Sequence, residues 1–420
     1  MKNIGFCKTD ILLPKKDLEK WSTIACDQFT SNINYWKDVE KITKGYPSAY
    51  NIVFPEVYLG SIDFANKIND INLKMEEYLK NDIFKEYKNS MIYVERKLLD
   101  GSIRKGIVGA LDLEEYDFNI GSNSLIRATE GTVMDRLPPR VKVRKKASLE
   151  VPHILVLIDD EKKEIIEQFS KKKRELEKVY SFDLMKSGGH IEGFLLKEKD
   201  IGIVENKLSK LIGKEYFEKK YNLQGEKPFL FAMGDGNHSL ATAKKCYEDL
   251  KKEIGDEKAK KSLSRFALVE INNLHDNSLK FQGIHRLIFD VDQDHFLKKL
   301  EEYSLENRKT NYETQNIILV KEKKKIKLKI KSPRHNLAVG SIQIFLDEYL
   351  KEFGGKIDYI HGEKEILEFS TDGKVGIILE SIKKSQLFKT ILLNGVLPRK
   401  TFSMGEAEEK RYYLESRKIR

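Results

Sequence analysis

The sequence predicts an α+β fold with a mixed β-sheet, and three local patterns support this prediction. Residues 154–158 form a short, wholly apolar run that is typical of a buried strand. Residues 91–99 and 103–111 alternate in hydrophobicity and are separated by Asp-Gly, a strong signal for a β-hairpin. Residues 62–78 place apolar side chains at helical spacing, so helices accompany the strands.

Two regions are expected along the chain. Residues 1–290 hold most of the predicted strands, and we interpret them as a catalytic region with an N-terminal extension. Within this region a charged helix is predicted over residues 162–180. Residues 291–420 change to a helix, paired lysine-rich strands (316–330) and further helices. We interpret them as a smaller α+β domain whose tail is a candidate to return to the active site.

The overall composition restricts the class of protein. Of the 420 residues, 40% are hydrophobic, which is enough for a full core and argues against a disordered chain. The formal net charge of +10 is a mild bias that favours anionic ligands. The alternative explanation for most of the lysine runs is that they cover solvated faces.

The cysteines and the first residues indicate a compartment. Cys7, Cys26 and Cys246 are too few and too scattered for a disulfide framework or a zinc site, and they fit a reducing environment. The start of the chain has no apolar signal core, and no apolar run approaches the roughly 18 residues of a membrane-spanning helix. We therefore expect a cytoplasmic protein with no membrane partner.

The strongest functional pattern follows the apolar run at residues 229–233. That run ends in Gly-Asp-Gly-Asn-His-Ser (234–239), and an amphipathic helix comes next. A helix N-terminus offers unsatisfied backbone N–H groups and a dipole that favours an anion, and Gly236 lets the backbone approach a phosphate closely. The polar residues of this turn are candidates for binding metal, donating to phosphate or moving a proton: Asp235, Asn237, His238 and Ser239.

A simpler interpretation is that Asp235 or Asn237 merely caps the helix. A cap accounts for one polar residue, whereas four stand together here. The segment lacks the Gly-x-x-x-x-Gly-Lys-Ser/Thr pattern, which argues against an ordinary P-loop kinase.

An arginine-rich stretch is the second group of candidates. The planar guanidinium binds phosphate oxygens in pairs, so several arginines beside Thr129 and Glu130 could neutralise a highly charged donor. These arginines are Arg127, Arg136, Arg140 and Arg144. The alternative is that they are surface residues paired with Asp135 and Glu150.

Two further groups carry weaker signals. Short polar residues after a buried strand are typical of active-site loops, and the N-terminal loop supplies Asp27, Gln28, Thr30 and Ser31, with Glu56 further on. In the middle of a later apolar strand, His285 and Arg286 could face a polyanion or could be satisfied core residues.

Taken together, these motifs resemble the family catalogued as DUF 1015. In order, they are Ala-Cys-Asp-Gln-Phe-Thr-Ser (25–31), Pro-Glu (55–56), Arg-x-Thr-Glu (127–130), Asp-Arg-x-Pro-Pro-Arg (135–140), Pro-His (152–153) and Gly-Asp-Gly-Asn-His-Ser (234–239). The resemblance covers nearly the whole chain, and the ordered combination makes it specific.

The resemblance implies a ParB/sulfiredoxin-like catalytic core, because the family's Asp-Gly-x-His motif is similar to the Asp-Gly-His-His-Arg of free serine kinases. Here Asn237 stands in place of the first histidine and Ser239 in place of the arginine. Without that arginine the motif lacks a guanidinium group for binding phosphate. The arginines at residues 127–144 could supply this positive charge instead. Members that resemble this version are implied to be pyrophosphate-dependent serine kinases, which make O-phospho-L-serine reversibly; an ATP- or ADP-dependent kinase is the alternative.

For this reaction we expect pyrophosphate on the N–H groups around residues 236–239 and Mg²⁺ on donor oxygens, with Asp235 as its carboxylate. The expected catalytic residues are Asp235, His238, Asp27 and Glu56, of which Asp27 or Glu56 would hold the ammonium of serine or take its proton. Phosphate-binding candidates are Gly236, Asn237, Ser239, Arg127, Thr129, Arg136, Arg140, Arg144, His285 and Arg286. Substrate-binding candidates are Gln28, Thr30, Ser31, Glu130 and His153.

Two other classes of protein remain as alternatives. A ParB-like nucleic-acid-binding protein is disfavoured, because the basic residues lack interleaved aromatics and no helix-turn-helix is evident; no nucleic acid is expected. A non-catalytic sensor would bind a phosphometabolite without turnover. The expected partners are L-serine, pyrophosphate, O-phosphoserine and phosphate, and the oligomeric state is left open between monomer and dimer.

Overall fold

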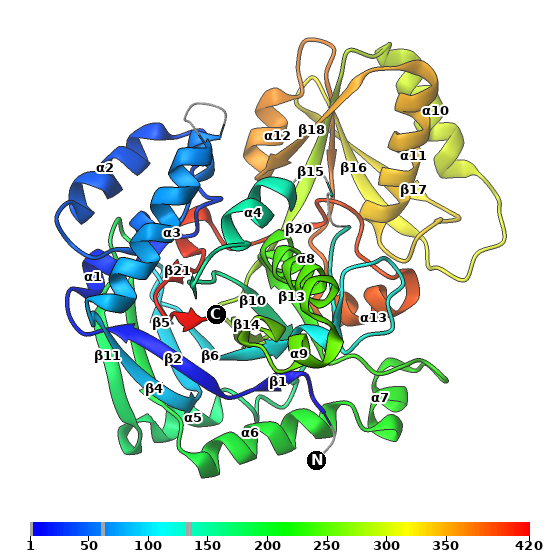
Figure 1. Ribbon diagram of the computed structural model, residues 1–420. Coiled ribbons are helices and arrows are strands. Elements are labelled where there is room, and N and C mark those ends of the chain that lie inside the picture. The colour runs from blue at the N-terminus through cyan, green and yellow to red at the C-terminus, as the bar shows by residue number, and fades with distance from the viewer. Residues whose placement is uncertain (1–2, 60–63, 132–133, 135–136) are drawn as a thin grey trace. The chain divides into compact units, whose positions relative to one another are not determined.

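A computed structural model describes residues 3–59, 64–131, 134 and 137–420 (Figure 1). The chain divides into two compact units. The first comprises Met1–Leu279 together with Glu406–Arg420, and the second comprises Lys280–Gly405. The first unit is therefore discontinuous in sequence, and the strand at residues 281–289 belongs to the second unit.

A mixed ten-stranded sheet forms the centre of the first unit. In spatial order its strands are β11 (Glu177–Asp183), β12 (His190–Leu195), β5 (Ile92–Lys97), β6 (Ile103–Asp112), β14 (Phe266–Asn273), β10 (Leu155–Ile158), β13 (Phe231–Asp235), β8 (Ile126–Arg127) and β7 (Tyr116–Asp117), and β1 (Phe6–Cys7) pairs with β6. β10 runs parallel to β14 and antiparallel to β13, which in turn runs parallel to β8. The predicted α+β class with a mixed sheet is confirmed.

Helices and short strand pairs surround this sheet. The helices are α1 (Leu18–Trp21), α2 (Ile33–Thr43), α3 (Phe64–Lys80), α4 (Leu137–Arg144), α5 (Gln168–Lys172), α6 (Glu198–Leu211), α7 (Lys214–Tyr221), α8 (Asn237–Ile254) and α9 (Asp256–Lys260). The strand pairs are β2 (Thr9–Pro14) with β4 (Phe84–Ser90), β3 (Thr23–Ile24) with β21 (Tyr412–Tyr413), and β9 (Leu149–Glu150) with β22 (Arg417–Lys418).

Both faces of the sheet are covered by apolar cores. Successive side chains of a strand point to opposite faces, so Ile107 and Val108 of β6 enter different cores. The core around Ile107 includes Val204 of α6 and Tyr247 of α8, whereas the core around Val108 includes Trp36 of α2. The helix α8 is thus buried along one side against the sheet, and its first residue follows directly on the β13 turn.

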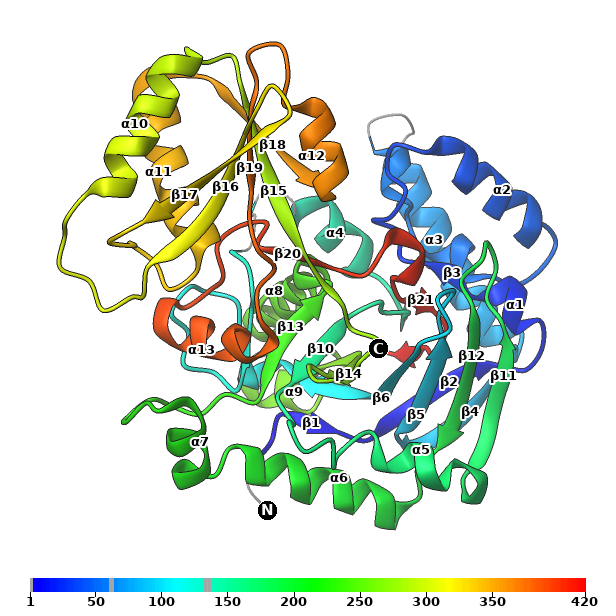
Figure 2. The same cartoon turned by 180° about the vertical axis from the view of Figure 1, so that it is seen from behind.

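The tail at residues 406–420 completes the first unit. β21 pairs with β3 and β22 pairs with β9, and Figure 2 shows this red segment beside β3. Arg411 donates to the carboxylates of Glu270 and Glu415, and Arg417 donates to Glu150. All five side chains are almost fully buried, so the tail is held by ion pairs inside the core.

Local predictions have mixed outcomes. The hairpin is confirmed, because β5 and β6 pair antiparallel and Gly101 in the turn has φ +81°. The predicted helix over residues 162–180 is wrong, since only Gln168–Lys172 is α-helical there and Glu177–Asp183 forms β11 at the sheet edge. Charged side chains are common on edge strands, so composition did not separate this strand from a solvated helix.

The second unit has its own sheet of six strands. Its elements are β15 (Phe281–Phe289), α10 (Gln293–Leu305), β16 (Gln315–Lys321), β17 (Lys324–Ile330), α11 (Ala338–Phe353), β18 (Lys356–His361), α12 (Glu363–Phe369), β19 (Val375–Ile378), α13 (Lys384–Asn394) and β20 (Phe402–Met404). The predicted lysine-rich pair is confirmed as the antiparallel β16 and β17. Within the described residues of both units, no helix has the length and apolar character needed to cross a membrane.

Candidate functional site

The turn between β13 and α8 has the geometry that its glycine predicts. Gly236 has φ +79°, a left-handed conformation that side chains other than glycine adopt at a cost. A Cβ atom at this position would lie 3.2 Å from the Cα of Ile154, so the turn is also tightly packed. No side chain among the described residues caps α8, and the first N–H groups of the helix are therefore not occupied by a side-chain cap.

Asp235 lies at the end of β13 beside a residue from the tail. Its Oδ1 accepts a hydrogen bond of 2.9 Å from the N–H of Gly236. Its Oδ2 lies 3.5 Å from the Nζ of Lys410, and the two side chains are 21% and 16% exposed. The carboxylate is therefore partly buried, close to a cation, and in loose contact with it.

Polar side chains from the start of α8 continue the site. Asn237 Nδ2 is 3.4 Å from the hydroxyl of Thr129, while Asn237 Oδ1 is buried with no hydrogen-bond partner in the described part of the chain. Ser239 Oγ lies 3.5 Å from Nε2 of His153, and the backbone C=O of His238 accepts a hydrogen bond from Thr242. A buried acceptor without a partner is costly, so Asn237 Oδ1 is a suitable oxygen for a ligand.

A second carboxylate approaches from the N-terminal loop. Asp27 lies 3.8 Å from Nε2 of the buried His153, whose Nδ1 is 3.1 Å from the hydroxyl of Tyr413. Burial acts to raise the pKa of the Asp27 carboxyl, but His153, the hydrogen bond from Gln28 and the charge of Lys410 outweigh it, and the pKa is lowered. Asp27 is thus ionised at neutral pH.

The loop that carries Asp27 is held in an unusual conformation. Phe29 has φ +53°, and its ring stacks on Tyr35 with a centroid distance of 4.0 Å. Trp36 donates to the carbonyl of Gln28, and the N–H of Glu56 donates to the carbonyl of Cys26. Left-handed backbone at an aromatic residue is strained and persists only where the surroundings enforce it, which fits a loop that positions a functional group.

The other predicted residues of this loop and its neighbours lie in different environments. Glu56 forms an ion pair with Arg140, and both side chains are about three-quarters buried. Thr30 and Ser31 are exposed, and Glu130 is half-buried. The predicted residues that the structure places around Asp27 and the β13 turn are Asp27, Gln28, Thr129, His153, Asp235, Gly236, Asn237, His238 and Ser239.

Several of the predicted arginines are engaged in structural contacts instead. Arg127 donates to the carbonyls of Ser124 and Lys227 and lies over the ring of Phe229. Arg144 forms an ion pair with the buried Glu150, as one alternative from sequence expected. Arg136 lies outside the described residues.

His285 and Arg286 belong to β15 of the second unit. Arg286 is fully buried and donates to the carbonyls of Ile284, Arg399 and Lys400. His285 Nδ1 accepts from a backbone N–H, and burial lowers the pKa of its imidazole. These contacts match the alternative that both are satisfied core residues.

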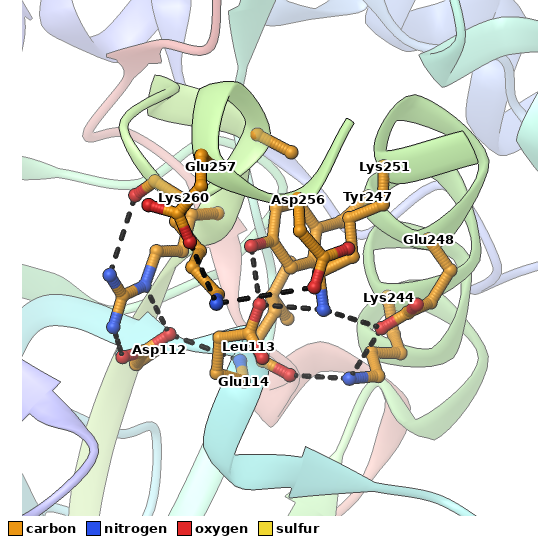
Figure 3. A network of polar contacts seen from close by, with 12 residues as sticks. Asp112, Leu113, Glu114, Lys244, Tyr247, Glu248, Lys251, Asp256, Glu257 and Lys260 are labelled. Atoms are coloured by element: carbon orange, nitrogen blue, oxygen red, sulfur yellow. Dashed lines mark hydrogen bonds and ion pairs between the residues drawn. The ribbon is translucent and has the colours of Figure 1, made fainter. Parts of the chain in front are cut away.

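The far half of α8 is anchored by a polar network (Figure 3). The hydroxyl of Tyr247 donates to Glu114 over 2.5 Å, and Lys251 forms a 2.7 Å ion pair with the same carboxylate. Lys244 donates to the carbonyl of Leu113 and pairs with Glu248. Together with the apolar face of α8, these contacts fix the helix whose N-terminus forms the site.

Sequence reasoning missed Lys410 and Tyr413. Both stand in the tail, far along the chain from the turn at residue 236, and a single lysine in a lysine-rich sequence carries no signal. The sequence predicted that the tail is a candidate to return to the active site, but it did not identify either residue.

Among the described residues, a cluster of acidic and histidine side chains elsewhere in the first unit could hold a metal ion. Ligand atoms of Asp159, Glu161 and His275 lie within 4.8 Å of one another, after the end of β10. Lys220 Nζ is already 3.0 Å from Asp159 Oδ1, so a cation is built into this cluster. By contrast, Asp235 and the unpartnered Asn237 Oδ1 are hard oxygen donors, the ligand type that Mg²⁺ prefers.

Comparisons with known proteins give the following likenesses. Solved structures include a mutant free serine kinase in complex with AMP, with 16% sequence identity, a TM-score of 0.30, and coverage of 52% of this chain and 85% of that chain. Another is a conserved hypothetical protein from Pyrococcus furiosus, with 14% identity, a TM-score of 0.27, and coverage of 50% and 84%. Likeness at this level establishes neither the fold nor the chemistry of the chain.

Sequence comparison is more informative. None of the curated proteins matches the chain. The family described as "Protein of unknown function (DUF1015)" matches residues 8–349, which is well over half of the sequence. The chain belongs to the DUF1015 family.

Proposed function

We propose that the chain is a phosphotransferase that makes O-phospho-L-serine from L-serine, with pyrophosphate as the donor. The observation that carries this proposal is the junction of β13 and α8. There a tight glycine turn and uncapped helix N–H groups lie beside Asp235, Lys410 and the unpartnered Asn237 Oδ1. Helix N-termini of this kind bind small anions, and phosphate is one of the anions found at them.

The donor would be held by groups of the turn. The N–H groups at the start of α8, with His238 and Ser239, would contact its oxygens. Asp235 and Asn237 Oδ1 would hold Mg²⁺, which when bound supplies positive charge to the donor oxygens. The family resemblance implies this donor, and ATP or ADP remains the alternative.

The acceptor serine would lie toward the N-terminal loop. The Glu56–Arg140 ion pair offers a carboxylate and a guanidinium side by side, which match the α-ammonium and α-carboxylate of a free amino acid. The backbone of Glu56 is hydrogen-bonded to Cys26, next to Asp27, so this pair is adjacent to the second carboxylate. A free amino acid is therefore favoured over a serine within a protein chain.

The transfer step would use Asp27 as the base. Its lowered pKa keeps the carboxylate ionised, and His153 orients it. The serine Oγ attacks phosphorus, the new Oγ–P bond forms as the bridging P–O bond breaks, and the electron pair of that bond leaves with phosphate. The hydroxyl proton passes to Asp27. Because the transition state is loose, alignment and fixed charge contribute more than the strength of the base.

The experiment that tests this function is a donor panel. Purified full-length protein is incubated with Mg²⁺ and L-serine, and with pyrophosphate, ATP or ADP in separate reactions, and O-phosphoserine is measured by mass spectrometry. We expect product with pyrophosphate and little with ATP. Product with ATP alone would correct the donor, and no product with any donor, in the presence of tight pyrophosphate binding, would identify a non-catalytic sensor.

A further inference from the structure

We propose that Lys410, in the C-terminal tail, is the cation that binds the phosphate oxygens of the donor. This inference deepens the proposed function and rests on it. Lys410 Nζ lies 3.5 Å from Asp235 Oδ2, and its charge is also among the causes that lower the pKa of Asp27. One ammonium group thus acts on Asp235 and Asp27, two of the three carboxylates that the sequence predicts to be catalytic.

The backbone of Lys410 is held by buried guanidinium groups. Arg96 donates to the carbonyls of Glu408, Glu409 and Lys410 over 2.6 to 3.1 Å, and Arg104 donates to Glu409 over 2.7 Å. Both arginines are at most 5% exposed. Three consecutive carbonyls are therefore fixed from inside the core, and the side chain of Lys410 extends from a rigid backbone toward Asp235.

The contact with Asp235 suits an exchange of partners. At 3.5 Å it is longer than the 3.0 Å between Lys220 and Asp159, so Lys410 is not committed to a short hydrogen bond with the aspartate. A phosphate oxygen offers a stronger, charge-assisted hydrogen bond to an ammonium group. When the donor binds, Lys410 can contact it while remaining close to the negative charge of Asp235.

The need for such a cation follows from the arginines. Arg127, Arg144 and Arg286, which the sequence proposes for phosphate, are engaged with carbonyls or with Glu150. Lys410 would supply the positive charge that these arginines do not, and the leaving phosphate takes the electron pair of the broken P–O bond.

The test compares two lysines of the same tail. Lys410→Met removes the charge and keeps the aliphatic stem, and the matched control is Lys418→Met, whose lysine is 44% exposed and paired with Glu86. Serine phosphorylation is measured in the full-length protein, with circular dichroism to verify folding. We expect kcat/KM for pyrophosphate to fall at least about 100-fold in Lys410→Met and to stay within twofold in the control.

Chemical rescue and direct binding separate the possible outcomes. Lys410→Ala should regain part of its rate when ethylammonium is added, which a purely structural lysine would not show. If wild type is active and Lys410→Met retains its rate, the role of Lys410 is refuted while the proposed function stands. If wild type makes no product but binds pyrophosphate in calorimetry, and Lys410→Met does not bind, the proposed function fails and the lysine site stands. No binding by wild type refutes both.

Discussion

Asp159 and Asp235 each stand at the C-terminal end of a buried strand of the first unit and each lie near a lysine, yet their surroundings differ. Asp159, after β10, is 6% exposed, and its carboxylate contacts Lys220, His275 and Tyr221 at 2.6 to 3.0 Å. Asp235, at the end of β13, is 21% exposed and has one backbone hydrogen bond and the longer contact to Lys410. Because β10 and β13 are antiparallel, the two aspartates lie at opposite ends of this strand pair.

The difference teaches how to separate a structural carboxylate from one that can bind a ligand. The carboxylate oxygens of Asp159 already accept hydrogen bonds from protein donors. They therefore have little capacity left to bind a substrate. The carboxylate of Asp235 has fewer protein donors and can still accept contacts from a ligand. It lies beside a glycine turn and the unpartnered amide oxygen of Asn237. Partner geometry, rather than the presence of an Asp–Lys pair, therefore marks the candidate site.

The largest expected effect is on activity. Asp235→Asn should lower serine phosphorylation by at least about 10³-fold, because it removes the charge closest to the proposed transfer, while the thermal midpoint should change little. Steady-state kinetics and a melting curve on the same preparation check this. Full activity in Asp235→Asn would place the reaction elsewhere.

The next effect concerns the residue after Lys410. Arg411→Met should lower the free energy of unfolding by about 3–5 kcal/mol, since Glu270 and Glu415 would be left buried without their guanidinium partner. Urea unfolding measures this loss. If the variant were as stable as wild type, the tail would not be held by these ion pairs.

A smaller loss of stability is expected when Asp159 is changed. Asp159→Asn should cost about 1–3 kcal/mol, because Lys220 and His275 lose a charged acceptor, and turnover should be unchanged. If Asp159→Asn lost as much activity as Asp235→Asn, both carboxylates would serve the same reaction.

The ion pair of Asp159 also makes the stability of the protein depend on pH. Burial acts to raise the pKa of Asp159, but the hydrogen bond from His275 and the charge of Lys220 outweigh it, so the pKa is lowered. Its stabilisation is therefore complete above the ordinary pKa, near 4, and is lost as the pH falls through the lower folded value. Acid unfolding of wild type below about pH 4 should be steeper than that of Asp159→Asn.

The smallest predicted effect is at the start of α8. His238→Ala should reduce turnover by at least about tenfold, in line with the loss of one donor to the phosphoryl group. Initial rates at saturating pyrophosphate measure it, with Lys245→Ala, on the same helix and 42% exposed, as a control. An unaltered rate would show that the site is misplaced.

Much of the fold could be predicted from local pattern. The hairpin of β5 and β6, the strand–turn–helix at Gly236 and the lysine-rich pair β16 and β17 all follow from periodicity and turn residues. The strand β11 was mistaken for a helix because its pairing with β12 is a tertiary property that a charged segment does not reveal.

The candidate site was predictable only in part. The polar turn after β13 and the loop at Asp27 have short, dense motifs that could be found in the sequence. The roles of Arg127 and Arg144 depend on which carbonyl or carboxylate lies opposite, and this is decided by the fold. Lys410 lies near Asp235 on a tail whose backbone Arg96 and Arg104 bind, and no local pattern encodes these distant contacts.

The discontinuous first unit has a consequence for synthesis. A ribosome that has made residues 1–279 must still produce the whole second unit before the residues at 406–420 emerge. Until then Glu150 and Glu270 lack the guanidinium groups of Arg417 and Arg411, and the turn at Gly236 lacks its lysine. The nascent chain is thus expected to complete the first unit, and with it the candidate site at Gly236, only after residues 406–420 have been made and their strands have paired.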